Sequence, residues 1–164
     1  MAPISLLLSA WLGAATLFTA VVAPAAFAAL PSRTLAGAVV GRVLPVVFVA
    51  GIVAAVAALV LDRGRQGRSP RVRRIALIVT ALACGAAQFG VAPRIERVRR
   101  EIDGPIEQIA EGDPRRVAFG RLHAISVAWL GLAMLSAATT VVLASIAPKS
   151  HTSVRPEPAG TIAR

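Results

Sequence analysis

Hydrophobic positions are gathered into long blocks along this chain, with no period-two alternation of polar and apolar residues inside them. Four blocks carry no acidic or basic side chain apart from one histidine: Ile4–Leu30, Val43–Leu61, Ile75–Pro93 and Leu122–Pro148. The hydrocarbon core of a bilayer is about 30 Å thick and is crossed by roughly 20 helical residues. Backbone groups in lipid must hydrogen-bond within their own segment, so the pattern predicts four membrane-spanning helices rather than strands.

Helix-start and helix-end signals turn these blocks into a fold. The sequence predicts an all-α integral membrane protein, an antiparallel four-helix transmembrane bundle with helices at about 4–30, 34–61, 74–93 and 114–147. Ser32, Ser69 and Asp113 stand before the last three helices and are predicted N-caps. The helices form one domain over residues 1–148, and the Pro-, Ser- and Thr-rich segment 149–164 is a predicted disordered cytoplasmic tail.

The first block has an alternative interpretation as a signal peptide. Ala26-Phe27-Ala28 has the small-x-small form of a cleavage site. However, the first basic side chain is Arg33, and the apolar run is longer than a signal-peptide core of roughly 7–15 residues. We therefore expect an uncleaved first helix.

The connection between the third and fourth helices has a pattern of its own. Apolar residues recur in it at three- and four-residue spacing, at Ile95, Val98, Ile102, Ile106 and Ile109. Gly104-Pro105 interrupts this pattern and should break or kink a helix. The segment is predicted to be a short amphipathic helix near the lipid headgroups. A plain connector that covers the helix ends is the alternative.

Composition supports a membrane protein and narrows its partners. Of the 164 residues, 56% are hydrophobic, and the mean hydropathy is +0.71. A soluble core of this size could not hide so much apolar surface. The net charge is +10, but the basic residues flank apolar blocks, which indicates membrane lipids as partners and no nucleic acid. Homo-oligomers or a membrane protein partner are further expectations.

The distribution of charge gives a predicted orientation in a cell membrane. The side that holds the N-terminus, residues 62–74 and the tail carries nine basic and two acidic side chains, a net charge of +7. The other side carries nine basic and six acidic side chains, a net charge of +3. The positive-inside rule then places both termini in the cytoplasm.

Polar residues inside the apolar blocks are the candidate functional residues, because they are costly in lipid. Antiparallel helices bring most of them to the membrane half nearer residues 31–34 and 94–121, and we expect any site to lie there. The candidate polar cluster is Arg42, Gln88, Arg94, Arg121, His123 and Ser126. The candidate kink and packing positions are Pro24, Gly37, Gly41, Pro45 and Pro93. Arg42 is either a snorkelling residue or part of an anion or proton path, and His123 is either a packing residue or a ligand.

Motifs of catalysis and of metal binding are absent from the sequence. There is no GxSxG, no HExxH and no phosphate-binding glycine loop. Cys84 is the single cysteine and is predicted to be a small core residue. The sequence therefore predicts no enzyme, no catalytic residue, no metal and no cofactor.

Several short stretches together resemble a known family. They are Trp11-Leu12-Gly13, Val22-Ala23-Pro24 with Phe27, Leu30-Pro31, Ala36-Gly37, Gly41-Arg42 with Pro45, Val91-Ala92-Pro93-Arg94-Ile95, and Phe119-Gly120-Arg121-Leu122-His123 with Ser126. In order and spacing they resemble the transmembrane protein 205-like family, also described as domain of unknown function 4149. The resemblance implies a multi-pass helical membrane protein and brings no established activity. A looser similarity to copper-resistance membrane domains lacks the additional His and Met residues that would support it.

Three function classes remain open at this stage. The leading expectation is a non-enzymatic membrane protein that acts as a scaffold or accessory subunit, or that handles a small solute or ion. The first alternative is a copper- or haem-handling protein that uses His123. The sequence has one other histidine, His151, which lies in the tail. The second alternative is a membrane-embedded enzyme that acts on lipid or quinone.

Overall fold

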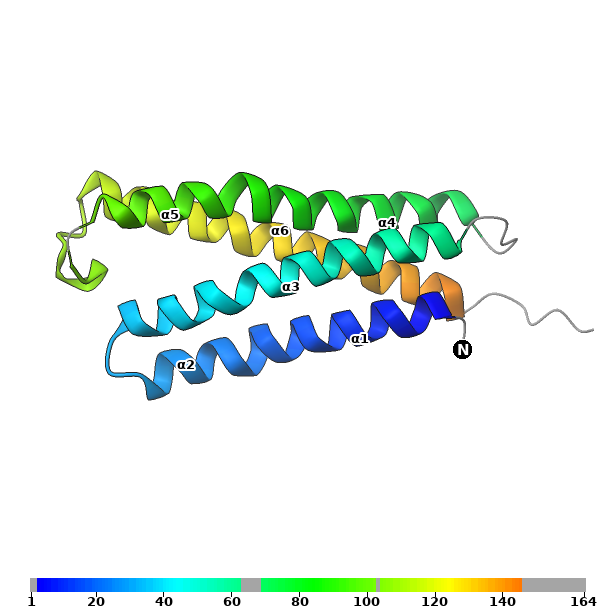
Figure 1. Ribbon diagram of the computed structural model, residues 1–164, viewed down its shortest axis with the longest axis horizontal. Coiled ribbons are helices and arrows are strands. Elements are labelled where there is room, and N and C mark those ends of the chain that lie inside the picture. The colour runs from blue at the N-terminus through cyan, green and yellow to red at the C-terminus, as the bar shows by residue number, and fades with distance from the viewer. Residues whose placement is uncertain (1–2, 63–68, 103, 146–164) are drawn as a thin grey trace, which may run out of the picture.

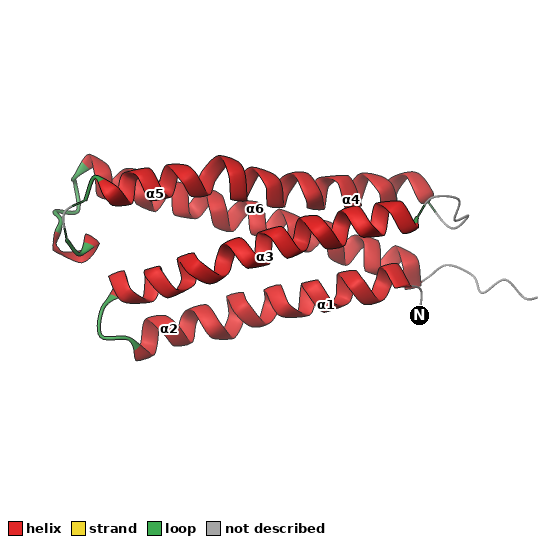
Figure 2. Ribbon diagram, in the orientation of Figure 1, coloured by secondary structure: helices red, strands yellow, loops and turns green. Residues whose placement is uncertain are grey.

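A computed structural model describes residues 3–62, 69–102 and 104–145. All regular elements within these ranges are helical (Figure 2). Four helices are long and apolar enough to cross a membrane, which confirms the predicted fold class. Three arginines of the second connection (Arg63, Arg65 and Arg68), Asp103 and the predicted tail lie outside the described residues.

Each of the four spans is a continuous rod that joins one or more helical segments (Figure 1). The first joins α1 (Pro3–Leu17), the π-helical turn η1 (Phe18–Val22) and α2 (Ala23–Ala29). The second is α3 (Arg33–Leu61). The third joins α4 (Pro70–Gly85), the π-helical turn η2 (Ala86–Val91) and α5 (Ala92–Arg100), and a 3-10 turn, η3 (Ile106–Gln108), leads from it to α6 (Pro114–Ser145), the fourth.

Two of the rods carry a π-helical turn that ends two residues before a proline. Pro24 follows η1, and Pro93 follows η2. A proline has no N–H, and its ring collides with the carbonyl four residues earlier in an ordinary α-helix. The wider π-turn removes that collision, so the helix continues through each proline. For this reason the third rod continues to Arg100, whereas the sequence pattern predicted a helix that ends at 93; its start at Pro70 lies four residues before the predicted 74.

The predicted amphipathic segment is therefore not a separate helix. Its first half is α5, which continues the third rod without a break. Its second half contains only η3, after Gly104 with a φ of 99°, a conformation that favours glycine. The predicted interruption at Gly104-Pro105 is thus present.

The helix caps follow the prediction at two of three places. The side chain of Ser32 accepts a hydrogen bond from the Leu35 N–H at 3.2 Å, which confirms the cap of α3. Asp113 Oδ1 accepts a hydrogen bond from the Arg115 N–H at 2.8 Å at the start of α6, which confirms the second. Ser69 occupies the N-cap position of α4 as predicted, but it has a φ of 59° and its side chain makes no capping hydrogen bond.

The interior is packed tightly at the end of the bundle where α1 begins and α6 ends. Buried alanines of α3, α4 and α6 meet large buried side chains of α1 there: Ala54, Ala58, Ala83, Ala133, Ala137, Ile4, Leu8 and Trp11. Small residues let the helix backbones approach closely. Toward the opposite end, the α2–α3 hairpin diverges from α5 and α6 (Figure 1). The functional candidates lie in this more open half.

Candidate functional site

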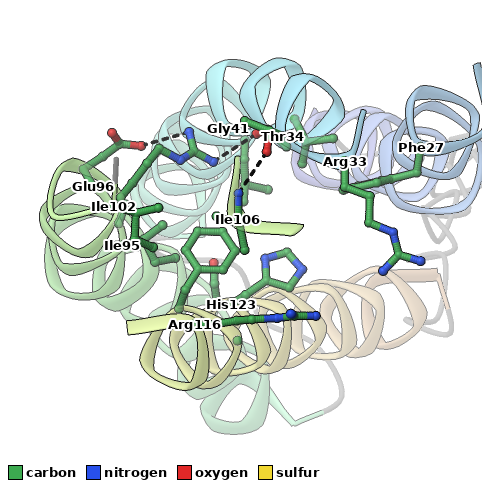
Figure 3. A pocket seen from close by; sticks show the side chains of 18 of the residues that line it. Phe27, Arg33, Thr34, Gly41, Ile95, Glu96, Ile102, Ile106, Arg116 and His123 are labelled. Carbon is green, nitrogen blue, oxygen red and sulfur yellow. Dashed lines mark hydrogen bonds and ion pairs between the residues drawn. The ribbon is translucent and has the colours of Figure 1, made fainter. Parts of the chain in front are cut away.

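A cavity of about 550 Å³ lies between α3 and the α5–α6 pair in the open half of the bundle (Figure 3). Its volume is in the range of sites that bind drug-sized molecules. It is lined by Phe27, Arg33, Thr34, Gly37, Val40, Gly41, Leu44, Pro45, Phe48, Gln88, Ala92, Ile95, Glu96, Arg99, Ile102, Gly104, Ile106, Glu107, Arg116, Phe119, Gly120, His123 and Ser126.

The chemical character of the wall changes with depth. On α3 the lining runs from Arg33 at the helix start to Phe48 near its middle, a rise of about 22 Å at 1.5 Å per residue. All five charged lining residues belong to the end near the connections: Arg33, Glu96, Arg99, Glu107 and Arg116. The deeper wall is apolar except for Gln88, His123 and Ser126. The cavity therefore has a charged mouth and a mostly apolar interior.

Arg99 is fixed in the wall by several contacts. Its Nη2 donates to the carbonyl oxygen of Gly37 at 3.4 Å, and its Nη1 lies 3.6 Å from a carboxylate oxygen of Glu96. Its guanidinium carbon lies 5.8 Å from the centre of the Phe119 ring, within cation–π distance. A Cβ on Gly37 or Gly41 would lie 3.6 Å from this guanidinium, an ordinary contact distance. The two predicted packing glycines therefore lie directly beside the arginine side chain.

The connection after α5 is attached to the start of α3 through Thr34. The Thr34 hydroxyl donates to Glu107 Oε2 at 2.8 Å and accepts from the Ile106 N–H at 3.3 Å. The hydrogen bond from Thr34 is the main cause that lowers the pKa of Glu107, and the nearby charge of Arg33 is a lesser one. Glu107 is therefore a carboxylate at the rim, held at the positive end of α3.

The other two arginines of the mouth differ in their partners. Arg116 Nη1 donates to the Ile109 carbonyl oxygen at 2.6 Å, and its Nη2 lies 3.6 Å from a carboxylate oxygen of Glu111. Arg33 makes no hydrogen bond and no ion pair within the described part of the chain. Figure 3 shows its side chain extending away from α3 on the same side of the cavity as His123.

Two further polar groups of the wall have no hydrogen-bond partner within the described ranges. His123 stacks on Phe119 with ring centres 6.4 Å apart and planes 5° from parallel, and its ring nitrogens make no hydrogen bond there. Gln88 Oε1 is fully buried and accepts no hydrogen bond. A buried acceptor without a donor costs about 1–3 kcal/mol, so the Gln88 carbonyl oxygen is an unsatisfied polar group of the wall.

Some of the candidate residues predicted from the sequence line the cavity, and the others do not. Gln88, His123 and Ser126 line the cavity together with Gly37, Gly41 and Pro45. The other predicted positions lie outside the cavity wall and are exposed: Pro24, Arg42, Pro93, Arg94 and Arg121. Arg94 donates to the Gly90 carbonyl oxygen on its own helix at 2.5 Å. The approach of Arg42 to His123 within one site is therefore not found.

Sequence reasoning missed most of the charged mouth. The sequence pattern puts Arg33 and Glu107 in connections, where charge is ordinary, and Arg116 in the first turn of the fourth helix. It puts Glu96 and Arg99 in a surface helix. One sequence signal pointed to this part of the site: apolar residues alternate with the charged ones at helical spacing. Three of these apolar residues, Ile95, Ile102 and Ile106, line the cavity in the structure.

It also missed a buried ion pair at the opposite end of the bundle. Arg73 Nε donates to Asp62 Oδ1 at 2.7 Å, and Arg73 Nη2 lies 2.5 Å from the same oxygen without hydrogen-bond geometry. The Asp62 side chain is 0% exposed and that of Arg73 5% exposed. The more exposed Arg74 approaches Asp62 Oδ2, with its Nε at 3.5 Å. This pair joins the end of α3 to the start of α4.

Metal ligands are not grouped in the described residues. No set of three or more His, Cys, Asp or Glu side chains there could hold a metal ion. Cys84 is fully buried in the core, as the sequence predicts. His151 lies outside the described residues.

Comparison with known proteins gives one match. The model of a family described as a domain of unknown function (DUF4149) matches residues 6–103, which is more than half of the chain. No curated protein and no solved structure matches the chain.

Proposed function

The chain belongs to the DUF4149 family, whose function is unknown, and from this premise we propose that it is a non-enzymatic membrane protein that binds a small amphipathic molecule in the cavity between α3 and α5–α6. The resemblance to the transmembrane protein 205-like family is part of the same proposal. So is a cell-membrane location with both termini in the cytoplasm, which puts the mouth of the cavity on the other side.

One observation carries the proposal: the wall is charged at its mouth and apolar inside. A purely structural void would be filled or lined by apolar groups alone, because unpaired polar groups in an interior are costly. Here Gln88 Oε1 is buried without a donor, although other cavity-facing groups such as Thr34 and Arg99 are paired. A molecule with an apolar body and a few polar atoms matches this wall.

Filling the cavity tests the proposal. A Cβ added at Gly120, which lines the cavity, meets no heavy atom within 4 Å. Gly120→Leu therefore occupies the cavity without a steric clash at its Cβ. Gly131 lies on the same helix, outside the cavity wall, and its Cβ also meets nothing within 4 Å. Gly131→Leu is the matched control.

The measurement is native mass spectrometry of the wild type and both variants, released from nanodiscs made from a cell-membrane extract. We expect a bound molecule on the wild type and on Gly131→Leu, and its loss from Gly120→Leu. Equal occupancy of the wild type and Gly120→Leu would show that the cavity does not hold the molecule, and the proposal would be wrong. The absence of any bound molecule from all three proteins would also contradict it.

A further inference from the structure

The charged end of the cavity specifies the ligand further. Resting on the proposed function above, we infer that the bound molecule is a single-chain amphiphile with an anionic head, a carboxylate or a phosphate monoester. Its head lies at Arg33, and its chain follows α3 toward Phe48.

The three arginines that line the cavity differ in whether other side chains already occupy them. Arg99 is occupied by Glu96, by the Gly37 carbonyl and by the Phe119 ring. Arg116 is occupied by Glu111 and by the Ile109 carbonyl. Arg33, within the described residues, has neither a hydrogen bond nor an ion pair, although it faces the mouth. A guanidinium offers five N–H donors in a fork that matches a carboxylate or a phosphate.

The acidic residues at the mouth leave this arginine available. Glu96 lies in contact with Arg99, and Glu107 accepts the Thr34 hydroxyl. Arg33 affects Glu107 only through its charge and makes no ion pair with it at 4.0 Å or closer. Arg99 and Arg116 each have a glutamate carboxylate within 3.6 Å, so Arg33 is the lining arginine without an ion-pair partner among the described residues. The start of α3, where Arg33 lies, adds the positive end of a helix dipole.

The apolar part of the cavity has a length and a volume that suit one alkyl chain. From Arg33 the wall continues along one face of α3 through residues at three- and four-residue spacing: Gly37, Val40, Gly41, Leu44 and Phe48. This length of about 22 Å and the volume of about 550 Å³ fit one alkyl chain with a small head. His123 adds a polar group to the wall, on the same side of the cavity as Arg33 (Figure 3).

The test uses four probes on the purified protein in neutral-detergent micelles: dodecyl phosphate, dodecanoate, dodecanol and inorganic phosphate. Binding is measured by native mass spectrometry. The variants are Arg33→Gln, Arg33→Lys and Gly120→Leu. Arg42→Gln is the control, because Arg42 is an exposed arginine of the same helix outside the cavity wall.

We expect the two anionic amphiphiles to bind at least about tenfold more tightly than dodecanol, since a charge-assisted hydrogen bond is worth roughly 1.5–3 kcal/mol. Arg33→Gln removes this preference and leaves dodecanol binding unchanged, whereas Arg33→Lys and Arg42→Gln keep the preference. Inorganic phosphate does not bind at concentrations at which dodecyl phosphate saturates the protein.

The outcomes separate this inference from the proposed function. If dodecanol binds as tightly as the anionic amphiphiles and Gly120→Leu abolishes the binding of all three, the anionic head is wrong and the cavity function stands. If Arg33→Gln weakens dodecanol and dodecyl phosphate equally, recognition of the head by Arg33 is wrong. Saturation by inorganic phosphate alone would overturn the alkyl chain. Binding that Gly120→Leu leaves unchanged for every probe would overturn both proposals.

Discussion

Removal of Arg73 should destabilise the bundle more than removal of any exposed arginine. The perturbation is Arg73→Leu, which keeps an apolar stem and deletes the guanidinium. Asp62, completely buried, then loses its 2.7 Å hydrogen bond and its closest cation. An isolated carboxylate in an interior is far more costly than a paired one.

The size of the effect follows from the burial and from one neighbour. Breaking a buried ion pair by removing one partner costs about 3–5 kcal/mol. Arg74 Nε already lies 3.5 Å from Asp62 Oδ2, so part of the charge stays compensated and we expect a loss of about 3 kcal/mol. Arg74→Leu, by contrast, removes a half-exposed side chain and should cost about 1 kcal/mol or less.

A double-mutant cycle distinguishes an ion pair from simple loss of packing. Asp62→Leu combined with Arg73→Leu leaves neither charge, so the double variant should be more stable than either single one. Unfolding of these four proteins and of Arg74→Leu is measured in mixed micelles of neutral detergent and sodium dodecyl sulfate. If the two single losses simply add, or if Arg73→Leu and Arg74→Leu are equally stable, the buried pair described here does not stabilise the fold.

Three further predictions concern the core and the connections. Gly51→Ala should destabilise the protein by about 1–3 kcal/mol, because the added Cβ would lie 2.7 Å from Cys84 Sγ and 2.8 Å from the Trp11 ring. Gly13→Ala is the control and should be neutral or slightly stabilising, because its Cβ would meet nothing within 4 Å. The unfolding midpoints of the two variants and of the wild type test this difference. A hydrogen bond from the Arg115 side chain is the main cause that lowers the pKa of Asp113 to about 2. The stabilisation by this carboxylate should therefore be complete above its ordinary pKa of 3.8 and be lost as the pH falls toward 2. An NMR titration of Asp113 should show a higher midpoint in Arg115→Ala than in the wild type. Thr34→Val should raise the pKa of Glu107, which a carboxyl-selective NMR titration can measure against Thr16→Val, whose hydroxyl only bonds within its own helix.

The number of spans could be read from the sequence because it depends on a single physical requirement. A long uncharged block has no other stable state in lipid than a helix, and the blocks are bounded by charges. The end of the third rod could not be read in this way. Pro93 normally stops a helix, and only the π-turn at Ala86–Val91 lets the chain continue to Arg100. Nothing local in the sequence distinguishes these two outcomes.

The site was located more accurately by topology than by residue type. Antiparallel helices place Gln88, His123 and Ser126 at the same depth whatever their side chains do, and all three line the cavity. Whether an arginine points inward depends instead on the rotation of its helix. Arg42 lies one residue beyond Gly41 and is exposed outside the cavity wall, while Gly41 lines it. A rotation of 100° per residue separates the two positions, and the uniformly apolar surface of a membrane helix gives no sequence signal for it.

The cavity is closed at its inner end, and this closure helps to distinguish a protein that binds a small molecule from one that conducts it across the membrane. Past Phe48 the interior closes: Gly51 is in contact distance of Trp11 and Cys84, and any added Cβ would collide with both. The Trp11 indole is held there by its hydrogen bond to the Val47 carbonyl oxygen at 2.9 Å. Beyond this layer the buried Asp62–Arg73 pair ties α3 to α4 at the far end.

A molecule that enters at the charged mouth therefore meets a packed floor near the middle of the bundle. Passage of a solute to the other side would require separation of α3 from α1 and α4 across this floor, while binding and release at the mouth require no such change. The packing thus favours a protein that holds or presents an amphiphile at one membrane face over one that conducts a solute across.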